Sequence, residues 1–167
     1  MVDPLAGKEL YAWQRSVLEM VTGEVDSRKV LWIYEQTGAV GKTTLAKSIC
    51  LNCETAIYVG GSANDVKFAL ATLHKEKRPM PTIVIWDIPR SSEQYVSYGG
   101  IEQVKNGIFF SNKYESAQII FNSPHVVCFA NFSPDRSKLS EDRWDVRRII
   151  DGVLHADAGV RFAFHEG

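Results

Sequence analysis

Residues 30–51, VLWIYEQTGAVGKTTLAKSICL, decide the fold of this chain. The first five form a continuous apolar run with the length of a buried β-strand, and residues 42–51 are predicted to form an α-helix. A loop with two glycines, Gly38 and Gly41, joins the two elements. When a strand, a glycine loop and a helix follow in this order, a lysine and a threonine at the start of the helix predict a phosphate-binding loop.

The predicted phosphate-binding loop consists of Gly38, Ala39, Val40, Gly41, Lys42, Thr43 and Thr44. Glycines let backbone amides curl around phosphate oxygens, and the amino end of the following helix adds partial positive charge. Lys42 would reach the terminal phosphates of a nucleoside triphosphate, and the Thr43 hydroxyl would ligate magnesium. The pattern G-x-x-x-x-G-K-[ST] is broken at its first position, where Gln36 stands. The alternative interpretation is an ordinary tight turn.

The composition fits one domain with a sizeable core, since 45% of the 167 residues are hydrophobic. The 19 basic and 20 acidic side chains nearly cancel, so a nucleic-acid partner would have to be gripped locally. Three cysteines favour a reducing intracellular compartment over a disulfide framework. No apolar run is long enough to span a membrane. Cys50 and Cys53 form a C-x-x-C, for which we prefer a partly buried helix face over a zinc site.

Apolar spacing predicts further elements on both sides of the loop. The expected elements are a helix at 9–22 that ends at Gly23, a strand at 56–59, a helix that begins with a capping box at Ser62 and Asp65, and strands at 82–86 and 126–130. Strands that alternate with helices predict an α/β fold, here a three-layer P-loop nucleotide triphosphatase with a central parallel sheet.

Two of the expected strands stop at a single polar residue, Asp87 after residues 82–86 and Asn131 after residues 126–130. Ligands bind beyond the carboxyl ends of parallel strands, so both side chains should converge on the glycine loop. Asp87 would deliver a carboxylate to magnesium, and the Asn131 amide would hydrogen-bond the attacking water and the terminal phosphate. A plain turn or strand-end residue is the alternative for each.

The residue that activates water is left open, because Ile88 stands where many hydrolases place a second acid. Candidate bases are Glu93, Glu102 and Glu115, although a solvated surface charge is the preferred interpretation of each. An arginine offered by a neighbouring subunit could stabilise the transition state, and the candidates are Arg143, Arg147 and Arg148.

Together with the block GIFFSNKYES at 107–116, this order of motifs resembles the superfamily 3 helicases. It is most similar to the helicase part of replication-associated (Rep) proteins of circular single-stranded DNA viruses, such as circoviruses and nanoviruses. The likeness runs from Trp13-Gln14 to Arg143-Trp144. It implies an AAA+-like ATPase that assembles as a ring, usually a homo-hexamer, with ATP and Mg²⁺ bound between subunits and a β-hairpin protruding into the pore.

Carried over by motif, the resemblance implies roles for individual residues. Lys42 and Thr43 correspond to Walker A, Asp87 to Walker B, Asn131 to the sensor of motif C, and Arg143 to the arginine finger. Lys113 lies in the hairpin block and would bind single-stranded DNA. The residues themselves also favour this contact, because Lys113 has the aromatic neighbours Phe109, Phe110 and Tyr114, and single strands bind to cations beside stacking surfaces.

The resemblance also implies the domain organisation and the function. Residues 1–24 would be the helical tail of an oligomerisation region, and residues 25–167 the ATPase domain. The paired histidines and tyrosine of the nicking endonuclease of such proteins have no counterpart here, so that domain would belong to the rest of a parent protein. The expected function is an ATP-dependent DNA helicase or translocase in rolling-circle replication, acting in the host nucleus. Alternatives are a small-molecule P-loop kinase and a nucleotide-gated assembly module without turnover.

Overall fold

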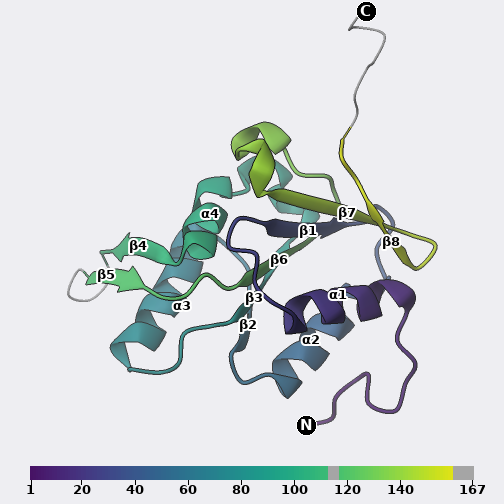
Figure 1. The fold of residues 1–167 in the computed structure, drawn as a ribbon, viewed down its shortest axis with the longest axis horizontal. Coiled ribbons are helices and arrows are strands. Elements are labelled where there is room, and N and C mark those ends of the chain that lie inside the picture. The colour runs from purple at the N-terminus through teal and green to yellow at the C-terminus, as the bar shows by residue number, and fades with distance from the viewer. Residues whose placement is uncertain (113–116, 160–167) are drawn as a thin grey trace, which may run out of the picture.

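The computed structural model describes residues 1–112 and 117–159, which form three layers around one central sheet. The sheet has the strand order β2-β3-β6-β1-β7-β8 (Figure 1). Its strands are β1 (Val30–Tyr34), β2 (Ala56–Val59), β3 (Ile83–Ile88), β6 (His125–Ala130), β7 (Trp144–Ile150) and β8 (Val153–Ala156). Every neighbouring pair is parallel except β7 and β8, which are antiparallel.

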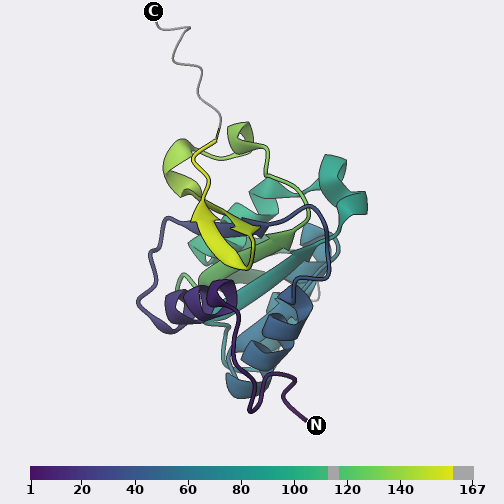
Figure 2. The ribbon, with the colours of Figure 1, turned by 90° about the vertical axis from the view of Figure 1, so that its right-hand side faces the viewer.

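Two helices cover each face of this sheet (Figures 1 and 2). The helices α1 (Ala12–Thr22) and α2 (Lys42–Asn52) pack on one face, and α3 (Ala63–Lys75) and α4 (Tyr98–Asn106) pack on the other. Three short 3₁₀ helices, Arg90–Tyr95, Arg136–Lys138 and Glu141–Arg143, lie in the connections. The predicted three-layer α/β fold with a central parallel sheet is confirmed, except that the edge strand β8 is antiparallel.

The position of β1 explains why residues 30–34 are apolar without interruption. Trp32 and Tyr34 join the hydrophobic cluster beneath α3 and α4, whereas Leu31 and Ile33 join the cluster beneath α1 and α2. Both faces of the strand are therefore buried, and no position on it favours a polar side chain. The Trp32 indole also donates to the carbonyl of Phe132 at 2.9 Å, which satisfies its buried N–H.

The predicted end of α1 and the predicted start of α3 are confirmed, but α1 begins at Ala12 rather than at residue 9, and one strand end is wrong. Gly23 caps α1, and Ser62 and Asp65 form the capping box of α3. Strand β3, however, continues past Asp87 to Ile88. Ile88 is buried in the cluster with Trp86 and is paired with β6, so the ladder does not stop at the carboxylate. Asp87 therefore lies within the paired part of β3 rather than after its end.

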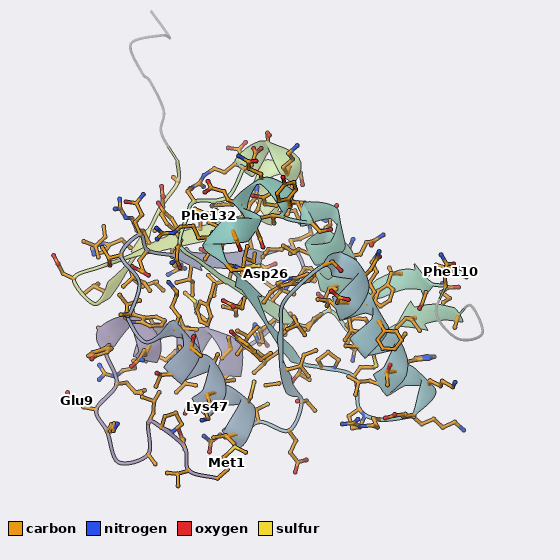
Figure 3. The ribbon with its side chains drawn as sticks, turned by 180° about the vertical axis from the view of Figure 1, so that it is seen from behind. Met1, Glu9, Asp26, Lys47, Phe110 and Phe132 are labelled. Atoms are coloured by element: carbon orange, nitrogen blue, oxygen red, sulfur yellow. The ribbon has the colours of Figure 1, made fainter. Side chains whose placement is uncertain are left out.

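A separate two-stranded hairpin projects from the three layers (Figures 1 and 3). It consists of β4 (Ile108–Ser111) and β5 (Ala117–Ile120). Phe109 and Ile119 are buried against the cluster beneath α3 and α4, whereas Phe110 points away from it and is exposed. The predicted protruding hairpin is confirmed. Residues 113–116, which include Lys113 and Glu115, lie outside the described residues, so the role predicted for Lys113 stays a prediction.

The amino-terminal helix α1 is packed into the hydrophobic core on the same face of the central sheet as α2. Trp13, Val17 and Val21 are buried and join the cluster beneath α1 and α2. Cys50 lies in α2 and Cys53 caps it, both partly buried against this cluster. The described residues hold no group of three or more His, Cys, Asp or Glu side chains arranged for a metal ion. None of the described helices combines the length and apolarity needed to cross a membrane.

Candidate nucleotide site

The loop between β1 and α2 is tightly curled, as expected for the predicted phosphate-binding loop. Gly38, Ala39 and Gly41 all have positive φ angles, of 82°, 57° and 95°. Gly41 caps α2, and its carbonyl accepts the Leu45 amide at 3.0 Å, so the helix begins directly at Lys42. The amides of the first helical turn have no partner within the helix and are available to an anion.

The loop lines a cavity of about 590 Å³ in which the predicted residues meet. Residues 38–44 supply one wall, Asp87 and Asn131 supply a second, and Tyr58 and Phe129 lie beside them. The remaining lining comes from the amino-terminal segment and the start of α1, namely Pro4, Leu5, Lys8, Glu9, Tyr11 and Gln14. The volume is in the usual range of small-molecule sites. The predicted convergence of the glycine loop with two strand ends is therefore present.

A buried acid, Glu35, organises the loop and was missed from the sequence. Its carboxylate accepts hydrogen bonds from the Lys42 ammonium at 2.6 Å, the Thr37 amide at 2.7 Å and the Gly38 amide at 2.8 Å. Only 3% of the residue is exposed. Burial acts to raise the pKa of Glu35, but the hydrogen bonds from Lys42, Thr37 and Gly38 outweigh it and lower the pKa to about 2. Glu35 is thus an internal anion that holds groups a phosphate would use.

The Lys42 ammonium also donates to Asn131 Oδ1 at 3.2 Å. Asn131 directly follows β6, which pairs with β1, so Glu35 and Asn131 extend from neighbouring strand ends. The lysine is held between them at the carboxyl edge of the sheet. Asp87 and Asn131 were found because each follows a buried apolar run, and Glu35 follows β1 in the same way. The same signal, applied to β1, would have found it.

The two predicted metal ligands, Asp87 and Thr43, line the same cavity beside Tyr58. Burial and the charge of nearby Asp87 raise the pKa of Tyr58 to about 12. Magnesium usually takes one or two protein oxygens and completes its shell with phosphates and water. The Asp87 carboxylate and the Thr43 hydroxyl fit that requirement and could hold Mg²⁺.

Among the described residues, the acids proposed as general bases do not line the cavity. Glu93 is exposed in the 3₁₀ helix after β3, and Glu102 lies on α4, where it pairs with Arg143. Glu35 is the described acid nearest to Lys42, at 2.6 Å. Ile88, in the position of a second Walker B acid, is buried in the core.

Arg143 is held inside its own chain. Its residue is 4% exposed, its Nη2 donates to Asn106 Oδ1 at 2.5 Å, and its Nε lies 3.2 Å from Glu102 Oε2. These contacts tie the 3₁₀ helix at 141–143 to α4. Arg147 is paired with Asp145 on its own strand at 2.9 Å.

Two other arginines contact the loop at Gln36, the position where the usual glycine is missing. Arg90 donates to the Gln36 carbonyl at 2.9 Å, and Arg148 donates to its side-chain oxygen at 3.4 Å. Gln36 therefore connects the loop to the segment after β3 and to β7. A glycine could offer only the first of these bonds, which gives the departure from the motif a structural purpose.

Helix α1 braces the loop from the other side. The Trp13 indole donates to the Val40 carbonyl and the Gln14 amide to the Gly41 carbonyl, both at 3.3 Å. Gln14 is 1% exposed and lies so close that a Cβ on Gly41 would be 2.9 Å from its Nε2. The loop thus depends on α1 for its position.

We expect Gly41→Ala to destabilise the protein and to weaken phosphate binding. Left-handed backbone strain costs about 1–3 kcal/mol in a residue with a Cβ, and the contact with Gln14 adds to it. Urea unfolding measures the loss. The control is Gly152→Ala, because Gly152 also has a positive φ, of 75°, but has open space at its Cβ. Equal losses in the two variants would show that the approach of Gln14 has no effect.

Comparison with known proteins identifies relatives over most of the chain. The chain is 41% identical over 120 residues to the master replication protein of Faba bean necrotic yellows virus (isolate Syrian SV292-88), covering 72% of this chain and 39% of that protein. It is 42% identical over 118 residues to the master replication protein of Subterranean clover stunt virus (strain F), covering 71% and 38%. It is 38% identical over 137 residues to Para-Rep C6 of Subterranean clover stunt C6 alphasatellite, covering 81% and 46%.

The chain spans less than half the length of these curated relatives. A scan against models of protein families finds no match. Over the aligned residues, which make up 71–81% of this chain, the identity is 38–42%. The chain belongs to the replication-associated (Rep) proteins of circular single-stranded DNA viruses.

Proposed function

We propose that this chain is the ATP-hydrolysing helicase domain of a viral replication initiator, which uses ATP and Mg²⁺ to move single-stranded DNA during rolling-circle replication. One observation carries the proposal: Lys42, Thr43, Asp87 and Asn131 line a single cavity around a curled glycine loop. The relatives' names, master replication protein and Para-Rep, support a role in viral DNA replication. Nuclear localisation in the host follows from that role and is part of the proposal.

The residues of the cavity would divide the chemistry among themselves. Lys42 would exchange Glu35 and Asn131 for oxygens of the terminal phosphate, and the loop amides would hold the inner phosphates. Asp87 and Thr43 would hold Mg²⁺, which when bound neutralises charge on the phosphates. Asn131, freed from Lys42, would orient the attacking water with its amide. Glu35 is an acid next to this position, although hydrogen bonds keep it a weak base.

The assembly is also part of the proposal. A homo-hexameric ring would place the hairpin β4–β5 in the pore, where Lys113 binds single-stranded DNA. Arg143, by its motif, would act on the ATP of a neighbouring subunit, for which it must first leave Glu102 and Asn106. Such arginines contribute about 10³- to 10⁵-fold in rate. A nicking endonuclease domain in the parent protein would supply the strand that the ring moves.

The test is ATP turnover against protein concentration, with and without single-stranded DNA. We expect the rate to rise more steeply than the protein concentration, because sites completed between subunits need assembly. DNA should raise the rate further, and Lys113→Ala should remove this rise while leaving basal turnover. Lys138→Ala, which removes an exposed lysine on a 3₁₀ helix of the three-layer core, is the matched control.

Other outcomes would identify other functions. Turnover that is proportional to protein concentration and indifferent to DNA would exclude a ring translocase. Phosphate transfer to an added metabolite would indicate a small-molecule kinase. Binding of ATP without turnover under any condition would indicate a nucleotide-gated assembly module.

A further inference from the structure

We propose that the amino-terminal segment, residues 4–11, forms the subsite for the nucleobase, with the Tyr11 ring as its stacking surface. The inference rests on the proposed function, because it assigns the rest of the same cavity. It changes the role predicted for this segment from an oligomerisation tail alone to a wall of the nucleotide site.

The lining of the cavity leaves one place for a nucleoside. The terminal phosphate and the metal must lie near Lys42 and Asp87, where Tyr58 and Asn131 complete the wall. The inner phosphates belong at the start of α2. Apart from Phe129 on β6, the remaining lining consists of Pro4, Leu5, Lys8, Glu9, Tyr11 and Gln14. A ribose and a base that continue from the inner phosphates therefore meet the amino-terminal segment.

The segment is fastened to α2 at both ends, which makes it a built wall. At the far end, Asp3 accepts the Asn52 side-chain amide at 2.7 Å, at the last residue of α2. Asp3 also accepts the Leu5 amide at 2.9 Å, which turns the chain toward the cavity. At the near end, Gln14 bonds the Gly41 carbonyl and receives the Tyr11 amide at 3.0 Å. The segment thus runs along α2 from its end to its beginning.

Tyr11 is the aromatic side chain best placed to meet a base. Its Cε2 lies 3.8 Å from the position that a Cβ on Gly41 would take, so the ring borders the first turn of α2. The residue is 61% exposed, so its ring keeps open surface beside the cavity. A base stacked on the ring would cover this surface. Pro4 and Leu5 offer apolar surface in the same wall, and Lys8 and Glu9 offer polar groups at its rim.

This composition also predicts the specificity of the subsite. Stacking depends on the area of the base and tolerates its identity, since every base has a π-face. The lining adds flexible exposed side chains, Lys8 and Glu9, in place of a fixed donor and acceptor pair. We expect purine nucleotides to bind more tightly than pyrimidine nucleotides, with little difference between adenine and guanine.

The experiment separates the base from the phosphates. Calorimetry measures the binding of ADP and of inorganic tripolyphosphate, each with Mg²⁺, to the wild-type chain and to Tyr11→Ala. Alanine substitution at a base-stacking position typically costs at least about 5-fold in affinity, so ADP should weaken by this factor or more. Tripolyphosphate has no base and should bind as it does to wild type. Tyr11→Phe should restore ADP binding, because the stacking ring is kept.

The control is Tyr95→Ala, which removes an exposed tyrosine, 81% accessible, outside this cavity and should leave both ligands unaffected. Equal weakening of ADP and tripolyphosphate in Tyr11→Ala, or no weakening of either, overturns the base subsite while the phosphate site stands. A wild-type chain that binds neither ligand overturns the proposed function and the subsite together. Weakening of ADP alone, rescued by phenylalanine, supports the subsite.

Discussion

Lys42→Ala is expected to destabilise the fold as well as abolish nucleotide turnover. The Lys42 ammonium lies 2.6 Å from the Glu35 carboxylate, and the side chains of the two residues are only 13% and 4% exposed. Removing one partner of a buried ion pair leaves an uncompensated charge and typically costs about 3–5 kcal/mol. A loss of activity in this variant would therefore combine a missing catalytic group with a weakened fold.

The double variant Glu35→Gln/Lys42→Ala separates the two effects. It removes the buried negative charge together with its cation, so we expect it to recover most of the stability lost in Lys42→Ala while turnover stays absent. Urea unfolding at neutral pH measures the stability. Arg78→Ala breaks an exposed pair with Glu76, whose side chains are 62% and 50% accessible, and should cost less than about 1 kcal/mol. A Lys42→Ala chain as stable as Arg78→Ala would contradict a structural role for the buried pair.

The pH dependence of stability gives a second measure of Glu35. Its pKa is about 2 in the folded chain, against an ordinary value of 4.5. A lowered pKa stabilises the folded state fully above pH 4.5, and this contribution is lost as the pH falls toward 2. Glu35→Gln should therefore make the loss of stability between these pH values shallower than in wild type.

Much of the fold was predictable because buried strands appear in the sequence as continuous apolar runs. The apolar run at 30–34 has both faces buried, and the run at 126–130 is buried along its whole length, so each reads as an internal strand without knowledge of its neighbours. Helix α4 and strands β7 and β8 were not predicted from the sequence. The end of β3 was also predicted wrongly. There Ile88 is apolar and continues the ladder, and only its pairing with β6 shows that Asp87 is not the last residue of the strand.

The site was less predictable, because its missing members act through partners distant in the sequence. Glu35 matters because the loop turns back and brings Lys42 to it. Tyr58 matters because β2 pairs with β3, which brings it near Asp87. No spacing in the sequence fixes the register of two strands that are separated by a helix. Tyr11 and Gln14 lie at the start of α1, and their contacts with the loop depend on how that helix packs.

Arg143 shows a different limit, since its motif and its surroundings point to different roles. The motif resembles that of an arginine finger, which must be available to a neighbouring subunit. The structure instead surrounds the guanidinium with Glu102 and Asn106 and leaves 4% of the residue exposed. A side chain with these contacts stabilises its own chain, whatever it does in an assembly.

Arg143→Ala is therefore expected to cost about 3 kcal/mol of stability, because it removes a buried side chain together with its hydrogen bond to Asn106 and its ion pair with Glu102. Urea unfolding of the isolated chain measures this. Arg147→Ala is the matched control. Arg147 pairs with Asp145, two residues away on the same strand, and the two side chains are 30% and 31% exposed. Loss of this pair should cost less than about 1 kcal/mol.

An Arg143→Ala chain that unfolds like wild type but hydrolyses no ATP would contradict the structural role and would indicate a side chain released to act between subunits. The distinction is sharpest in mixtures with the double variant Glu35→Gln/Lys42→Ala. A finger that acts across the boundary would pair an intact Lys42 site in one chain with an intact Arg143 in the next, and turnover would return on mixing. If Arg143 only holds α4 in place, mixing restores nothing, since the defect stays within the chain that carries it.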